Sequence, residues 1–133
     1  MDEFLRLQAL RDLAVLDSAP EPQFDALVAA AALVCNVPIS LVSLIDSDRQ
    51  WFKANFGLTG VTETARELAF CAHAIQHDEI LEIRDARNDA RFADNLLVTG
   101  APDIRFYAGA PLRMSSGAAV GTLCVIDREP RTL

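Results

Sequence analysis

The residues best suited to covalent chemistry are a cysteine and a histidine in the segment Phe70-Cys71-Ala72-His73. A cysteine nucleophile is activated when an imidazole lies within hydrogen-bonding reach of its thiol. In a helix, side chains at positions i and i+2 point about 200° apart, because each turn holds ~3.6 residues. A direct pair therefore requires an extended segment, and we expect Cys71 to line the core or a pocket.

Metal binding needs several ligands at a suitable spacing. His73 has no second ligand beside it in the sequence, which disfavours haem or metal ligation. Asp85, Asp89 and Asp94 lack the ligand spacing of a calcium-binding loop. The three cysteines are widely separated and show neither a disulfide framework nor zinc-finger spacing. We therefore expect neither a metal ion nor another cofactor.

Charged residues of both signs gather between Asp85 and Arg105. For the aspartates we expect ion pairs and caps, with Asp89 as a helix N-cap. For Arg91 and Arg105, a second interpretation is that the guanidinium faces a cavity and meets an anionic or planar ligand, which its fork of donors suits. Arg105 precedes Phe106-Tyr107 in an apolar strand, and both interpretations stay open for it.

Aromatic residues concentrate near two expected hairpins and one long irregular segment. They are Trp51, Phe52, Phe70, Phe92, Phe106 and Tyr107. Aromatic residues usually form cores, but several of them with a few polar groups are also typical of small-ligand pockets. Trp51 and Tyr107 are the better pocket candidates, because each carries a polar group. The sequence has no phosphate-binding glycine loop, nucleophile elbow or close carboxylate pair, so we expect binding and no catalysis.

Two hairpins are expected to position these residues. Ile39–Ile45 is apolar and β-branched, and Gln50–Phe56 alternates between two kinds of side chain, so the two segments form one antiparallel pair. The stretch Arg105–Arg128 holds two further strands joined by Ser115-Ser116-Gly117, which has the small and polar residues of a turn. We expect this second hairpin to be central in the sheet.

Glycine and proline inside the central hairpin indicate local irregularity. Gly109 and Gly121 predict a bend or a close approach to the backbone, and Pro111 predicts a sheet edge or a bulge. Irregular sheet centres often border a cavity, so the hairpin is expected to form the floor of one.

Helices and irregular chain make up the remainder. Apolar spacing predicts helices over Asp2–Leu16 and from about Pro22 to Asn36. Glu63–Ile75 is expected to be helical in pieces, and a short helix is expected around Phe92–Val98. The irregular segment 84–102 is long for a compact domain, and such segments are usually functional. Antiparallel hairpins flanked by helices define an α+β domain.

Composition restricts the possible partners. The 133 residues suffice for one domain, 51% of them are hydrophobic, and the net charge is −7. The negative charge argues against nucleic acid and anionic membrane surfaces. An acidic N-terminus without a long apolar run predicts neither a signal peptide nor a membrane span, and unpaired cysteines favour the reducing cytoplasm.

Several blocks of the chain, in order, resemble GAF domains of the bacterial branch fused to diguanylate cyclases and sensor histidine kinases. The resemblance runs from about Leu13 to Leu133 and rests on LDSAPEPQFD, PISLVSLIDSDRQWFKANFGL, FCAHAI, DARNDARFADNLLVTG and IRFYAGAPL…GAAVGTLCVIDREPR. It implies a PAS-related fold with a central antiparallel sheet of about six strands, helices on one face, and a ligand cavity and loops on the other. Residues 1–16 would be a connector or packing helix, and residues 17–133 the GAF domain with its C-terminal helix truncated.

The resemblance also implies a role and a site. The role is non-catalytic sensing of an unknown small molecule, in a homodimer that regulates an attached or partner output domain. By position the pocket would draw on eight residues: Trp51, Phe70, Cys71, His73, Asp85, Asn95, Arg105 and Tyr107.

The chain departs from the GAF pattern in three places, and two alternative functions stay open. Relatives commonly have Asn-Pro where this chain has Asn95-Leu96, bilin-binding relatives have adjacent Cys-His where Ala72 intervenes here, and relatives continue into a C-terminal helix. One alternative is a thiol enzyme of the free methionine sulfoxide reductase type, which uses several close cysteines. The other is a purely structural dimerisation domain with a filled core.

Overall fold

The architecture is a six-stranded antiparallel sheet between two layers of helices and loops, in a computed structural model that describes residues 2–133. Spatial strand order is β3-β2-β1-β6-β5-β4. The strands are β1 (Ile39–Ile45), β2 (Arg49–Phe56), β3 (Glu63–Ala65), β4 (Leu81–Ile83), β5 (Phe106–Arg113) and β6 (Ala119–Asp127). The α-helices are α1 (Glu3–Asp12), α2 (Pro22–Cys35), α3 (Phe70–Ala74) and α4 (Leu96–Thr99), with 3-10 turns η1 (Arg66–Leu68) and η2 (Ala86–Asn88). The α+β class and the six-stranded sheet are confirmed.

Strands β1 and β6 form the centre of the sheet because their apolar runs are covered on both faces. Every residue of β1 is buried, and Ile39–Leu44 pairs with Gly121–Ile126. This pairing joins the two predicted hairpins, β1–β2 and β5–β6, into one sheet. Pro111 lies beyond the residues of β5 that pair with β4. Proline has no backbone N–H to donate, and no β4 carbonyl lies opposite Pro111 that would need one.

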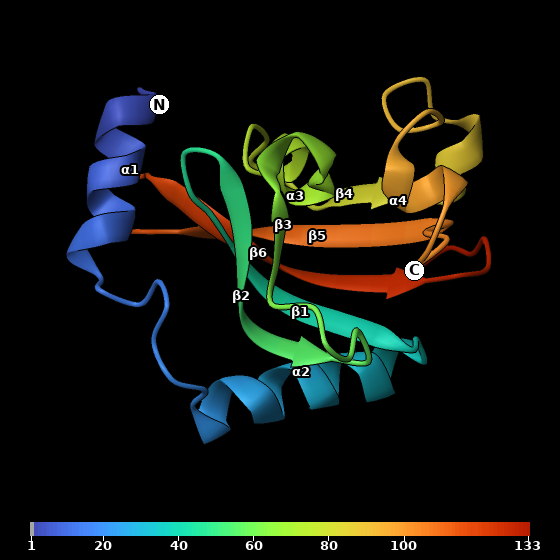
Figure 1. The fold of residues 1–133 in the computed structure, drawn as a ribbon, viewed down its shortest axis with the longest axis horizontal. Helices are drawn as coiled ribbons and strands as arrows, with labels where there is room; N and C mark the ends of the chain where they lie inside the picture. The colour runs from blue at the N-terminus through green and yellow to red at the C-terminus, as the bar shows by residue number, and fades with distance from the viewer. Residues whose placement is uncertain (1) are drawn as a thin grey trace.

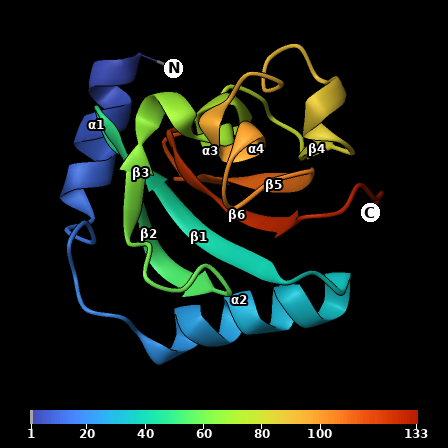
Figure 2. The ribbon, with the colours of Figure 1, turned by 45° about the vertical axis from the view of Figure 1, so that its right-hand side comes forward.

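Helix α2 covers one face of the sheet, and α1 lies across its end (Figure 1; Figure 2). Pro22 occupies the first turn of α2, and Asn36 closes the helix in a left-handed conformation. Val28 packs on Val42 and Ala54, while Leu10 of α1 joins a separate cluster at the sheet end. Among residues 2–133, no helix has the length and apolarity needed to span a membrane.

The first predicted helix is shorter than expected. Helix α1 ends at Asp12 rather than near Leu16, because Ala14 turns the chain with a φ of 54°. This turn directs Val15 and Leu16 back onto the cluster around Leu10. An ion pair between Glu3 and Arg66 of η1, at 2.6 Å, further ties α1 to the domain.

The other face carries α3, α4 and irregular chain, as Figures 1 and 2 show above the sheet. Two predictions here were wrong in detail. Glu63–Ala65 is an edge strand rather than helix, because it pairs with Arg49–Trp51 of β2. The short helix is Leu96–Thr99 rather than Phe92–Val98, because the Asn95 side chain caps it by accepting from the Leu97 amide at 2.8 Å.

A bulge interrupts the expected alternation along β2. Val42 pairs with Ala54 and Ser43 with Phe52, so Lys53 is the extra residue. Ala54 therefore faces α2 instead of sharing the Phe52 face. Lys53 is buried, and its ammonium pairs with Glu21 at 2.7 Å beside the start of α2.

Replacing Gly121 with alanine should disrupt the sheet centre. A β-carbon at this position would overlap the Ser43 carbonyl oxygen, which is backbone and cannot yield. We expect Gly121→Ala to lower the free energy of unfolding by about 3 kcal/mol or more, as overpacking of a rigid site does. Urea denaturation measures the change. Gly100→Ala is the matched control, because its β-carbon would make only ordinary contact, and equal losses in the two variants would contradict this account of β1–β6 pairing.

Candidate functional site

A cavity of about 130 Å³ lies between the sheet and the α3–α4 layer. Its floor comes from β1, β2, β5 and β6, and its cover comes from β3, α3, the loop after β2, and α4 with the following loop. The lining residues are Ile39, Leu41, Gln50, Phe52, Leu58, Val61, Thr64, Phe70, Cys71, Leu97, Ala101, Pro102, Ile104, Tyr107, Cys124 and Ile126. None of these described lining residues is an aspartate, glutamate, lysine, arginine or histidine, so the site suits an uncharged, mainly apolar molecule.

Gln50 supplies the free polar group of this cavity. Its amide nitrogen donates to Thr64 Oγ1 at 3.0 Å, which fixes the side chain. Its carbonyl oxygen is buried and has no hydrogen-bond partner among residues 2–133. A buried acceptor without a donor is costly, so a ligand that brings an N–H or O–H group would relieve it.

Two cysteines meet where α3 of the cover contacts β6 of the floor. Cys71 Sγ of α3 lies 4.0 Å from Cys124 Sγ of β6, and both thiols are buried. Tyr107 Oη and Thr122 Oγ1 donate to Cys71 Sγ at 3.0 and 2.9 Å. Tyr107 reaches the thiol because its ring crosses Gly109, where a β-carbon would collide with the ring and hydroxyl.

This network changes the acidity of its members. Burial raises the pKa of the Cys71 thiol, but hydrogen bonds from Cys124, Thr122 and further hydroxyl groups outweigh burial and bring it to about 7. The pKa of Cys124 is raised well above its usual value by its hydrogen bond to Cys71 and by burial. Burial and the nearby thiols raise the pKa of Tyr107 likewise. Cys71 is therefore the thiol that loses its proton, while Tyr107 and Cys124 remain donors.

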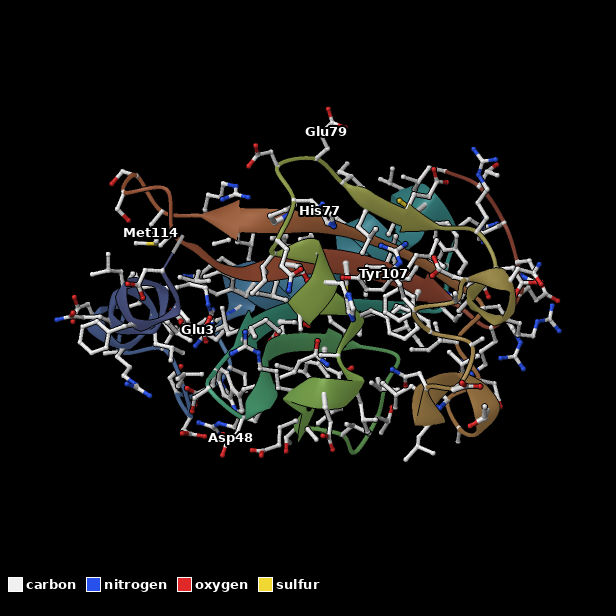
Figure 3. All side chains as sticks on the ribbon, turned by 90° about the horizontal axis from the view of Figure 1, so that it is seen from above. Glu3, Asp48, His77, Glu79, Tyr107 and Met114 are labelled. Carbon is white, nitrogen blue, oxygen red and sulfur yellow. The ribbon has the colours of Figure 1, made fainter. Side chains whose placement is uncertain are left out.

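Three of the eight predicted site residues line the cavity: Phe70, Cys71 and Tyr107. Tyr107 lies in the interior of the molecule, while the labelled Asp48 and Glu79 lie at opposite margins (Figure 3). Trp51 does not line the cavity. It packs with Leu10, Leu44 and Val120 on the opposite face of the sheet, because side chains alternate along β2 and Trp51 points away from Phe52.

Two predicted residues hold the cavity cover without lining it. Asn95 Nδ2 donates to the Leu68 carbonyl at 3.0 Å, which links α4 to η1. Arg105 Nη1 donates to the carbonyl of Val98 at 2.8 Å, which holds the end of α4 over the sheet.

The last two predicted residues lie outside the cavity. His73 makes an edge contact with Phe92, their ring centroids 4.8 Å apart, and burial together with Arg91 lowers its pKa. Asp85 caps η2 and pairs with Arg87 at 2.8 Å. Within the described chain, no three His, Cys, Asp or Glu side chains are grouped to hold a metal ion.

Sequence reasoning missed Gln50, Leu58, Val61 and the α4–β5 loop as parts of the site. The period-two pattern of β2 places Gln50 with Phe52, which was the available signal. The loop residues offered none, because their contacts to the sheet are long-range.

Cys35 lies apart from the other two cysteines. It packs beside Ala32 and Phe106 on the face of the sheet that α2 covers. A three-cysteine site of the reductase type is therefore not assembled around the cavity of the described chain. The cavity also distinguishes this core from the filled core of a purely structural domain.

The fold is an α+β domain in which a six-stranded antiparallel sheet and a cover of helices and loops enclose an apolar cavity. The family model named GAF domain matches residues 19–132, and the chain belongs to this family.

One curated relative matches nearly the whole of this chain. A cyclic di-GMP phosphodiesterase of Pseudomonas aeruginosa is 45% identical over 130 residues, which is 98% of this chain and 22% of that protein. The chain thus spans about a fifth of that relative.

Solved structures show the same fold at low identity. The GAF domain of an Acinetobacter phosphoenolpyruvate-protein phosphotransferase has a TM-score of 0.64 at 21% identity, covering 98% of this chain and 81% of that one. A type II free methionine-R-sulfoxide reductase of Thermoplasma acidophilum has 0.67 at 13% identity, covering 93% and 81%. A domain of a Sinorhizobium meliloti two-component sensor histidine kinase protein has 0.59 at 16%, covering 88% and 79%.

Replacing Arg105 with alanine should loosen the cavity cover. The variant loses the donor that holds the Val98 carbonyl, and hydrogen bonds from charged groups contribute about 2 kcal/mol. We expect a drop of that size in unfolding free energy and faster amide hydrogen exchange in residues 96–104. Arg87→Ala, at an exposed ion pair, is the control and should change neither. Unchanged exchange in Arg105→Ala would show that the cover does not depend on this side chain.

Proposed function

We propose that this chain is a non-catalytic sensory domain that binds a small uncharged molecule and regulates an attached or partner output domain in bacterial signal transduction. The observation that carries the proposal is the apolar cavity with one unpartnered acceptor, Gln50 Oε1.

Cavity chemistry narrows the ligand class. The lining has no cationic side chain to replace the hydration of a phosphate or carboxylate group, which disfavours cyclic nucleotides and amino acids. The volume, about 130 Å³, is comparable with the roughly 150 Å³ of an engineered apolar cavity that takes up benzene. A small aromatic or aliphatic molecule with one N–H or O–H donor fits both constraints.

The relative from Pseudomonas aeruginosa supports a link to an output domain. This chain corresponds to 22% of a protein named for cyclic di-GMP hydrolysis, so most of that protein lies outside the matched part. A cyclic di-GMP enzyme or a histidine kinase is the output we infer. The three free thiols support the reducing cytoplasm as the location.

Exposed apolar side chains support a homodimer. On α2, Leu33 and Val34 are 83% and 82% exposed, and on α1 Phe4 is 72% exposed. Neighbouring apolar side chains on one helix surface are typical of a protein interface. A second copy of the chain is the partner we infer.

Indole is a suitable probe of the cavity, because it is planar, uncharged and has one N–H donor. Isothermal titration calorimetry should detect indole, and benzofuran, which lacks the donor, should bind about five- to tenfold more weakly. In Gln50→Met the preference should disappear, since the acceptor is lost.

Leu97 and Leu96 provide a matched pair on α4. Leu97 lines the cavity and Leu96 is exposed. Leu97→Trp should fill the cavity and weaken indole binding at least about tenfold, while Leu96→Trp should bind as the parent does. Equal binding in both variants, or no binding by the parent chain, would refute a small-molecule site here.

The inferred dimer is tested by light scattering coupled to size-exclusion chromatography. A charge within a desolvated apolar contact is costly, so Leu33→Glu with Val34→Glu should give monomer. Leu96→Glu, an exposed site on the other side of the sheet, should leave the mass unchanged. A monomeric parent chain would remove the dimer from the proposal.

A further inference from the structure

The pair of buried thiols has chemistry that ligand binding does not use. Cys71 and Cys124 both line the cavity, with sulfur atoms 4.0 Å apart. They lie on elements of different rigidity. Cys124 is on β6, which pairs with β1 and β5 on its two sides, whereas Cys71 is on the five-residue helix α3.

We propose that Cys71 is an oxidation site, at which hydrogen peroxide entering the cavity forms a sulfenic acid that Cys124 converts to a reversible intramolecular disulfide. The site needs no other ligand, so this inference stands whether or not the cavity also binds the molecule proposed above.

The hydrogen bonds around the two thiols indicate that Cys71 is the sulfur that attacks peroxide. It receives hydrogen bonds from Tyr107 Oη and Thr122 Oγ1, at 3.0 and 2.9 Å, and both groups stabilise a thiolate. The buried Ser43 hydroxyl has no hydrogen-bond partner among residues 2–133, and it lies near enough to lower the Cys71 pKa as well. Thr122 and Ser43 also lower the pKa of Cys124, but its hydrogen bond to Cys71 and its burial outweigh them, so Cys124 keeps its proton.

The titratable groups that face Cys71 are Tyr107 from β5 and Cys124 from β6. Thr122 and Ser43 do not titrate. With its pKa at about 7, Cys71 is substantially ionised at neutral pH, and the thiolate is the form that attacks peroxide. Low pKa and access to a small oxidant are the properties of sensor cysteines.

The reaction balances in two steps. The Cys71 thiolate attacks one peroxide oxygen, the O–O bond breaks, an S–O bond forms, and the released hydroxide leaves as water after taking up a proton. Cys124 sulfur then attacks the sulfenic sulfur, the S–O bond breaks and an S–S bond forms. The Cys124 proton leaves with the hydroxide as a second water. The two thiols lose two electrons in total, and peroxide gains them.

Disulfide formation should move α3. The sulfur atoms must approach from 4.0 Å to about 2.05 Å, and β6 is held on both sides. Helix α3 therefore shifts toward the sheet, and Cys71 gives up its hydrogen bonds to Tyr107 and Thr122. Phe70, next to Cys71, is stacked on Phe92 at 4.2 Å and lines the cavity, so oxidation reshapes the cavity wall.

Intact-mass spectrometry after peroxide treatment tests the disulfide. With Cys35→Ser to leave only the proposed pair, we expect a monomer that is lighter by two hydrogen atoms, with no thiol left for alkylation after unfolding. Dithiothreitol should restore both thiols. In Cys124→Ser, Cys71 should instead take up one oxygen and react with dimedone, while in Cys71→Ser Cys124 should stay reduced.

Tyr107→Phe tests the positioning role of the hydroxyl. Losing this donor should raise the pKa that governs the oxidation rate by about one unit, and so slow the reaction roughly five- to tenfold between pH 6 and 7. The difference in rate should vanish above about pH 9, where the Cys71 thiol is ionised in both the parent and the variant. Near-ultraviolet circular dichroism verifies folding, and Phe52→Leu, which alters the cavity lining without removing a hydrogen bond to Cys71, is the control for packing.

Three results would overturn the inference. One is an unchanged mass of the Cys35→Ser protein under peroxide that fully oxidises free cysteine. Another is a disulfide formed only between chains. The third is equal oxidation of Cys124 in Cys71→Ser, which would deny Cys71 its special role.

Discussion

Antiparallel pairing of β1 with β6 is the constraint on which the rest of the structure depends. It joins two hairpins that are separate in the sequence, and it requires Gly121 because the Ser43 carbonyl occupies the space of a β-carbon. The Ser40 hydroxyl adds a buried bond by donating to the Cys124 carbonyl at 3.0 Å. Since side chains alternate along strands, this register decides which residues face α2 and which face the cavity.

The two faces of the sheet are covered by different physical means. Helix α2 packs through aliphatic and alanine side chains, so its contact is mainly hydrophobic. The α3–α4 side also has apolar contacts, but its irregular chain is held by side chains that bond backbone carbonyls, as Asn95 and Arg105 do. Few regular backbone bonds stabilise this cover, which makes it the part suited to local opening and ligand entry.

Beneath the cover, polar groups are concentrated at one place in an otherwise apolar core. Tyr107 and Thr122 converge on Cys71 within a low-dielectric interior, where each hydrogen bond is stronger than in water. This arrangement favours a charge on one sulfur and keeps the neighbouring sulfur protonated. The proposed binding and the proposed thiol chemistry would therefore share one wall of the cavity.

Local signals in the sequence determined the four long strands β1, β2, β5 and β6, helix α2 and the fold class. The apolar run Ile39–Ile45 and the helical spacing after Pro22 encode their own secondary structure, because periodicity is a property of neighbouring residues. Phe70, Cys71 and Tyr107 were also within reach, since an aromatic residue or cysteine in a buried segment must line the core or a pocket.

Only the tertiary structure decided which face of the sheet is hollow, and therefore why Trp51 packs under α1 while Gln50 lines the cavity. It alone brought Cys71 to Cys124, which are 53 residues apart. Pairing register, the bulge at Lys53 and the path of the 84–104 segment all arise from long-range contacts. Such contacts have no period in the sequence, because they form between segments whose separation along the chain is arbitrary.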